Sequence, residues 1–140
     1  MPMMALRYLR FVDQRRSKFT LEGLQVVDGA NVALVRFEER SKPRMIDSND
    51  EAAARGAFWI EPRTGRVLKS ELLFDTGKAA TRLRVRVRVG YVPHLAGETW
   101  VPASMDEEYR LGKGALAVEG HATYSNFRKF KVETSTTIKR

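Results

Sequence analysis

The segment from Thr81 to Val92 alternates strictly between cationic and apolar residues. Arg82, Arg84, Arg86 and Arg88 are separated by Leu83, Val85, Val87 and Val89. A period of two is that of a β-strand, whose successive side chains point to opposite faces of a sheet. A helix turns by about 100° per residue and would scatter the arginines around its circumference. The pattern therefore predicts a strand with its apolar side chains buried and its arginines exposed.

Turn residues between apolar runs predict two hairpins. Asp28-Gly29-Ala30 separates residues 24–27 from residues 31–40, and Pro62-Arg63-Thr64-Gly65 separates residues 57–61 from residues 66–75. Glycine adopts a positive φ at little cost, and proline presets φ for a tight turn. Further extended runs are expected at 98–102, at 105–111 and from Leu116 to Val132, with a bulge near residues 125–127.

Two segments are expected to form short helices. Residues 3–16 have a weak amphipathic pattern, and Ser48 and Glu51 have capping-box spacing ahead of Gly56. With seven to nine strands in hairpin order, the chain is predicted to be mainly β. The expected fold is a curved antiparallel up-and-down sheet, a half-barrel, with one or two short helices.

Length and composition favour one β-rich domain over residues 1–140, and the C-terminal part of a longer exported protein is an alternative. The chain has 43% apolar and 30% charged residues, as folded domains do, and lacks an apolar run near the ~20 residues of a membrane span. Arg7 and Arg10 interrupt the apolar start, so it is read as mature sequence without a recognisable signal peptide, or as the start of a chain cut from a longer precursor. The absence of cysteine excludes disulfides, thiolate nucleophiles and cysteine-bound zinc.

A net charge of +8 favours attraction to nucleic acid, another polyanion or an anionic membrane surface. The candidate polyanion site is the row Arg82, Arg84, Arg86 and Arg88. In the alternative interpretation, Glu71 and Asp75 lie on the same face of a neighbouring strand and pair with that row. The basic residues then form only a solvated outer face.

No arrangement of residues predicts catalysis, a metal or a cofactor. His94 and His121 lie 27 positions apart without further ligands at metal-binding spacing. The sequence contains neither a nucleophile elbow nor a phosphate-binding loop. In the acidic triplet 106–108, Glu107 has the parity of the apolar side chains. The aromatic and basic run at 124–131 is better explained by core packing than by base stacking.

Residues 58–71 resemble a hairpin of the periplasmic lipoprotein carrier-like proteins, the outer-membrane lipoprotein-sorting superfamily. Trp59-Ile60-Glu61-Pro62 followed by Thr64-Gly65 carries the likeness, and Tyr91, Trp100-Val101-Pro102 and residues 124–128 follow in the order of that family. The resemblance covers about residues 21–132. It implies a bent half-barrel closed by helices, a concave side that holds acyl chains, and a periplasmic or exported location. This chain has little helix to form such a lid.

The resulting hypothesis is a non-enzymatic module that binds a lipid-like or other hydrophobic ligand on the concave face of a bent sheet. The candidate lining, chosen by parity, is Phe58, Ile60, Leu72, Phe74, Val101, Met105, Tyr109 and Tyr124. The alternative hypothesis is a basic sheet that binds a polyanion through its arginine strand. The sequence specifies neither the ligand nor the oligomeric state.

Overall fold

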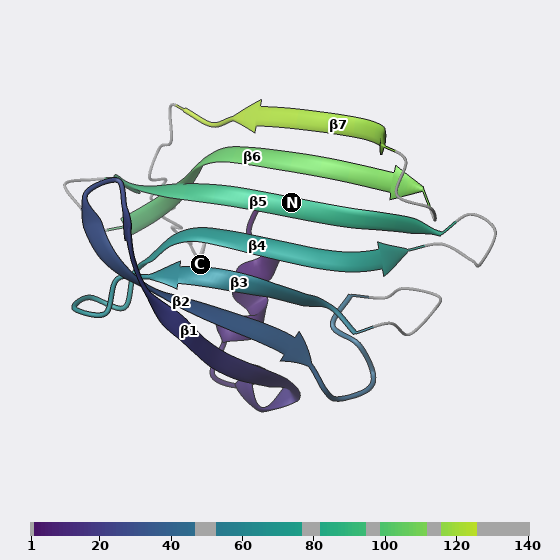
Figure 1. Cartoon of the computed structure of the whole chain (residues 1–140), viewed down its shortest axis with the longest axis horizontal. Helices are drawn as coiled ribbons and strands as arrows, with labels where there is room; N and C mark the ends of the chain where they lie inside the picture. The colour runs from purple at the N-terminus through teal and green to yellow at the C-terminus, as the bar shows by residue number, and fades with distance from the viewer. Residues whose placement is uncertain (1, 47–52, 77–81, 95–98, 112–115, 126–140) are drawn as a thin grey trace, which may run out of the picture.

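In the computed structural model, the chain forms an open antiparallel sheet of seven strands that lie side by side in chain order (Figure 1). The structure describes residues 2–46, 53–76, 82–94, 99–111 and 116–125. The strands are β1 (Ser17–Val27), β2 (Ala30–Glu39), β3 (Arg55–Ile60), β4 (Val67–Thr76), β5 (Leu83–His94), β6 (Thr99–Leu111) and β7 (Leu116–Thr123). Two 3-10 helices, η1 (Ala5–Leu9) and η2 (Gln14–Arg16), precede them. The predicted up-and-down β-sheet is confirmed.

The turn residues act as the sequence predicts. Asp28 and Gly29 have φ values of 50° and 79° between β1 and β2, and Gly65 has a φ of 74° between β3 and β4. The two values at Asp28 and Gly29 suit a two-residue hairpin turn, because they match the twist of the flanking strands, and Gly65 ends the longer turn of residues 62–65. The runs 98–102 and 105–111 are one strand, β6.

The N-terminal segment differs from the expected single helix. η1 begins without a side-chain cap, and Arg10 ends it in an extended conformation with φ −61° and ψ 137°. Uncapped first-turn amides weaken a helix start, so only short 3-10 pieces form. The capping box at 48–51 lies outside the described residues, as does most of the segment where a bulge was expected near 125–127.

The register of the strands separates an apolar face from a charged face. Leu72 pairs with Val87, whereas Glu71 pairs with Arg88. The side chains of Val85, Val87 and Val89 on the apolar face are buried, as predicted. Leu83, at the start of β5, is only partly buried. On the charged face, the arginines of β5 lie beside acidic residues of both neighbouring strands.

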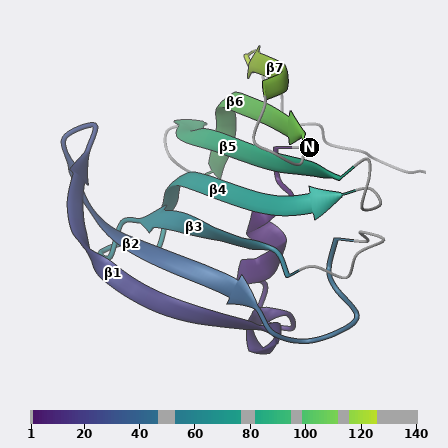
Figure 2. The same ribbon diagram turned by 45° about the vertical axis from the view of Figure 1, so that its right-hand side comes forward.

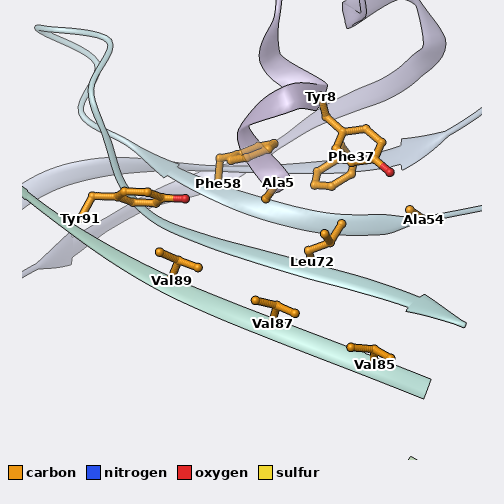
Figure 3. Packing of buried hydrophobic residues seen from close by; sticks show 10 residues of the cluster. All are labelled: Ala5, Tyr8, Phe37, Ala54, Phe58, Leu72, Val85, Val87, Val89 and Tyr91. Atoms are coloured by element: carbon orange, nitrogen blue, oxygen red, sulfur yellow. The ribbon is translucent and has the colours of Figure 1, made fainter. Parts of the chain in front are cut away.

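η1 covers the centre of the apolar face, behind the sheet in Figure 1. Ala5 and Tyr8 are buried there. The ring of Tyr8 lies 4.8 Å from that of Phe37, which stacks on Phe58 at 5.1 Å between centroids (Figure 3). Aromatic pairs at such distances add to the free energy gained from burial alone. Within the described part of the chain, a segment of five residues thus covers the centre of this face.

The β1–β2 hairpin curls away from the plane of the other strands (Figure 2). A bulge between Leu21 and Gly23 bends β1 near its middle. Beyond it, Val27 and Asp28 at the hairpin tip line a hollow on the charged face together with Gly90 of β5. The bend gives this end of the sheet a second, smaller buried region, which includes Val32 and Leu34 of β2.

The β5 alternation gives the first prediction. Val87→Asp places a carboxylate among Leu72 and the other apolar side chains, so we expect a loss of about 3–5 kcal/mol in the free energy of unfolding. Arg86→Gln, one residue away on the charged face, should change it by less than about 1 kcal/mol. Chemical denaturation of both variants measures the difference. Equal stability of Val87→Asp and the wild type would show that the two faces are assigned the wrong way round.

Gly56 gives the second prediction, because β3 passes very close to β4 there. A Cβ at Gly56 would overlap the carbonyl oxygen of Glu71 and lie 2.8 Å from Cε1 of Phe37. Backbone atoms of a central strand cannot move aside cheaply, so Gly56→Ala should cost about 1–3 kcal/mol. The control is Gly120→Ala, whose Cβ would meet Oε2 of Glu107 at an ordinary 3.7 Å. Thermal unfolding of the pair should separate them clearly.

Candidate functional site

Seven of the eight residues predicted to line a ligand site lie on the apolar face. Phe58 and Leu72 are fully buried, at 0% and 1% exposure. The others pack around them with part of their surface accessible: Ile60, Phe74, Met105, Tyr109 and Tyr124. The hydroxyl of Tyr124 lies 3.8 Å from the sulfur of Met105, which brings the end of the described chain back to β6.

The placement of Val101 on this face is wrong. Val89 pairs with Met105, but after a bulge Tyr91 pairs with Pro102 and Val92 with Val101. The extra residue in β6 reverses the parity of the strand before it. Val101 therefore lies with Val92 on the opposite face, and Trp100 packs against the core instead.

The N-terminal segment fills the centre of the predicted site. Tyr8 is 1% exposed and Ala5 is 4% exposed, and both lie against Phe58 and Leu72 in one cluster. A ligand that touched these two residues would have to displace η1. Sequence reasoning missed this because the N-terminal pattern carries no signal of what it packs against.

Apolar surface remains open beside η1, on the β1–β2 hairpin. Leu21, Leu24 and Val26 are 66%, 74% and 70% exposed. Leu21 pairs with Val35 and Leu24 with Ala33, so all three side chains belong to the apolar face. We call Leu21, Leu24 and Val26 the exposed strip. Ala33 also pairs with Ile60, which connects the strip to the buried core.

Glu107 of β6 places a carboxylate on the apolar face, away from the exposed strip. It lies between Val87 of β5 and Gly120 of β7 in the register. Burial raises the pKa of the Tyr109 hydroxyl, and the charge of Glu107 and its hydrogen bond to that hydroxyl raise it further. The Tyr109 hydroxyl thus stays protonated and donates a hydrogen bond to the Glu107 carboxylate. This bond gives the carboxylate a partner among apolar neighbours.

Two buried tyrosines, Tyr8 in η1 and Tyr91 in β5, have hydroxyls in different surroundings. The Tyr91 hydroxyl lies 3.0 Å from the Ser70 hydroxyl and 3.2 Å from the Pro2 carbonyl oxygen, to which it donates. The Tyr8 hydroxyl is buried and has no hydrogen-bond partner within the described part of the chain. Burial raises the pKa of both groups, and the Glu39 carboxylate further raises the pKa of Tyr8.

The arginine row is paired with carboxylates on both sides. Arg88 Nε lies 2.8 Å from Glu71 Oε2, Arg84 Nε lies 3.5 Å from Asp75 Oδ1, and Arg86 Nη1 lies 3.8 Å from Glu108 Oε2. The hydrogen bond to Glu71 raises the pKa of the Arg88 guanidinium. Arg82 is exposed just before β5. The pairing removes most of the unopposed charge that a polyanion site on this strand would need.

Two hollows lie on the charged face. One of about 480 Å³ lies beneath the tip of the β1–β2 hairpin, beside Lys69, Arg88 and Asp106. Another, of about 280 Å³, is lined by charged residues of β1 and β2 and by Arg55 of β3. Apolar and charged residues are mixed in both linings: Val27 and Val92 line the larger hollow, and Phe37 and Leu73 line the smaller one.

The described residues contain no group of three side chains suited to hold a metal ion. His121 contacts Asp106 across β6 and β7 at an exposed position, and His94 lies at the end of β5. Among the described residues, none of the helices is long and apolar enough to cross a membrane.

Comparison of the chain with protein-family models, with curated proteins and with solved structures finds no match in any of the three. The resemblance of residues 58–71 to a lipoprotein-carrier hairpin therefore depends on the sequence alone. The structure places these residues in the β3–β4 hairpin, with Phe58 in the core and Trp59 on the charged face.

The contrast between the two tyrosines gives the third prediction. Tyr8→Phe removes a buried hydroxyl without a partner, so the free energy of unfolding at pH 7 should stay within about 0.5 kcal/mol of the wild type or rise. Tyr91→Phe breaks two hydrogen bonds and should cost about 1–2 kcal/mol.

The same pair of variants has a pH signature. A raised folded-state pKa means that stability is complete below pH 10, the ordinary pKa of tyrosine, and falls as the unfolded chain ionises above it. Tyr8→Phe should therefore flatten the loss of stability above pH 10. Denaturation titrations at several pH values measure this, and an unchanged slope would contradict the burial of the hydroxyl.

Proposed function

We propose that this chain is a non-enzymatic binding module that holds a lipid-like or other hydrophobic ligand on the apolar face of its sheet. The observation that carries the proposal is the exposed strip, Leu21, Leu24 and Val26, which continues the apolar core out into solvent. Single exposed leucines are common on protein surfaces, but adjacent ones on one face typically mark an interaction site.

The form of the strip favours an elongated ligand. Its three side chains follow one strand, and Ile60 links them to the partly buried residues of β3 to β6. An acyl chain laid along this line removes apolar area from water on both sides, at about 25 cal/mol per Å². The resemblance to carriers of acylated lipoproteins supports the same ligand class, and a periplasmic or exported location with it.

η1 has a defined place in this proposal. It covers Phe58 and Leu72, so a ligand binds beside it on the strip or replaces it over the core. Either arrangement uses burial of the same apolar face, without a reacting group. The polyanion alternative is weaker, because Glu71, Asp75 and Glu108 already pair with the arginines.

The fourth prediction tests the strip. Native mass spectrometry of the purified protein should show a co-purifying lipid, and a fluorescent fatty acid should bind to the delipidated protein. Leu24→Ser with Val26→Ser should weaken binding of that probe by at least about tenfold, because each change removes roughly 1 kcal/mol or more of apolar contact. Both positions are exposed, so the fold should be unaffected.

The matched control is Val92→Ser, an exposed valine on the opposite face. It should leave binding of the fatty acid unchanged. Absence of binding to the wild-type protein, or equal loss in the control, would overturn the proposal.

A further inference from the structure

The turn between η1 and η2 presents two large apolar side chains to solvent. Phe11 is 87% exposed and Val12 is 70% exposed. The turn that carries them lies at the lower edge of the ribbon, beside the start of β1 (Figures 1 and 2). Tyr8, three residues before Phe11, is by contrast 1% exposed, so within the described part of the chain the core ends before this turn.

The backbone of this turn is held in place. The Asp13 amide donates to the Arg10 carbonyl at 2.8 Å, and the Gln14 amide donates to the same oxygen at 3.0 Å. On one side Tyr8 anchors the turn in the core, and on the other β1 begins at Ser17. The two apolar side chains are thus presented by a fixed scaffold, at no cost of ordering a loop on binding.

Basic residues flank the two apolar residues in the sequence. Arg7, Arg10 and Arg15 are exposed within the turn and its flanks. The Arg40 amide donates to the Arg16 carbonyl at 2.7 Å, which brings residues 40–44 alongside. Residues 7–18 and 40–44 contain eight basic residues and one acidic residue, Asp13, a net charge of +7 against +8 for the whole chain. The segments around Phe11 and Val12 and next to Arg16 thus carry a strong excess of positive charge.

We propose that this N-terminal turn, residues 7–16, docks the protein on an anionic lipid bilayer. Phe11 and Val12 enter the boundary between headgroups and acyl chains, and the surrounding cations contact the lipid phosphates. Exposed apolar residues flanked by basic ones bind membranes through burial of their apolar side chains and through electrostatic attraction to anionic lipids.

A bilayer fits the turn better than a nucleic acid does. Cations alone would suit either partner, but base stacking requires aromatic rings, and Val12 offers none. An aliphatic side chain next to an aromatic one gains by leaving water for hydrocarbon. The residues of the turn are distinct from the exposed strip, so this surface and the ligand site can be tested separately.

The fifth prediction uses vesicle flotation with the full chain. The protein should float with vesicles that contain phosphatidylglycerol at about 20 mM salt and much less with pure phosphatidylcholine vesicles, since the attraction is screened as the salt concentration rises. Arg7→Gln with Arg15→Gln should weaken binding by roughly 25-fold, about fivefold for each charge near the surface. The control, Arg63→Gln with Lys69→Gln, removes the same charge at the far end of β3 and β4.

The apolar contribution has its own variant. Phe11→Ser with Val12→Ser should weaken binding by at least about tenfold at unchanged net charge. Phe11→Trp should give additional tryptophan fluorescence that brominated lipids quench, relative to the wild-type protein with Trp59 and Trp100.

Three results would overturn the docking surface. They are absence of binding to the anionic vesicles at low salt, binding that Phe11→Ser with Val12→Ser leaves unchanged, and equal loss in the charge control. Tighter binding to a short single-stranded oligonucleotide than to the vesicles would assign the turn to nucleic acid instead. Because the strip is intact in every turn variant, fatty-acid binding should persist in all of them.

Discussion

The structure depends on how the apolar face of an open sheet is covered. Seven strands in a row bury apolar side chains on one side only if something packs against them. Among the described residues, η1 does so together with Met45 and Ile46, and its Tyr8 ring packs against Phe37, which in turn stacks on Phe58. The register of β2, β3 and β4 places these rings under η1, so the sheet and its cover specify each other.

η1 is five residues long and therefore contacts only part of the apolar face. The centre of the sheet is closed, whereas the β1–β2 hairpin keeps Leu21, Leu24 and Val26 in water. The same short segment also exposes Phe11 and Val12 at its far end. Both candidate interaction surfaces thus consist of apolar side chains that η1 does not cover.

Local patterns in the sequence predict the strands well and the connections between distant parts poorly. The alternation in β5 determines which side chains are buried, because a shift by one residue would bury charged side chains. Turn chemistry at Asp28-Gly29 and Pro62–Gly65 determines two hairpins in the same way. Val101 shows the limit of parity, since the bulge in β6 leaves no mark in the residue pattern.

Tyr8 and Glu39 show another limit, because their burial depends on parts of the chain that are distant in sequence. Glu39 is 3% exposed and accepts hydrogen bonds from the amides of Met45 and Ala54, which only the folded chain brings near.

The bulge between Leu21 and Gly23 has a consequence for how copies of this protein behave in a crowded solution. β1 is one of the two edge strands of the sheet, and an edge strand can pair with a strand of another molecule unless its edge is made irregular. Glu22 is the residue left unpaired by the bulge, and its carboxylate reaches Arg36 at 3.1 Å. The kink and the two charges interrupt the straight edge midway. A second molecule cannot continue the ladder along the full length of β1, so this edge of the sheet is protected from extending into a fibril.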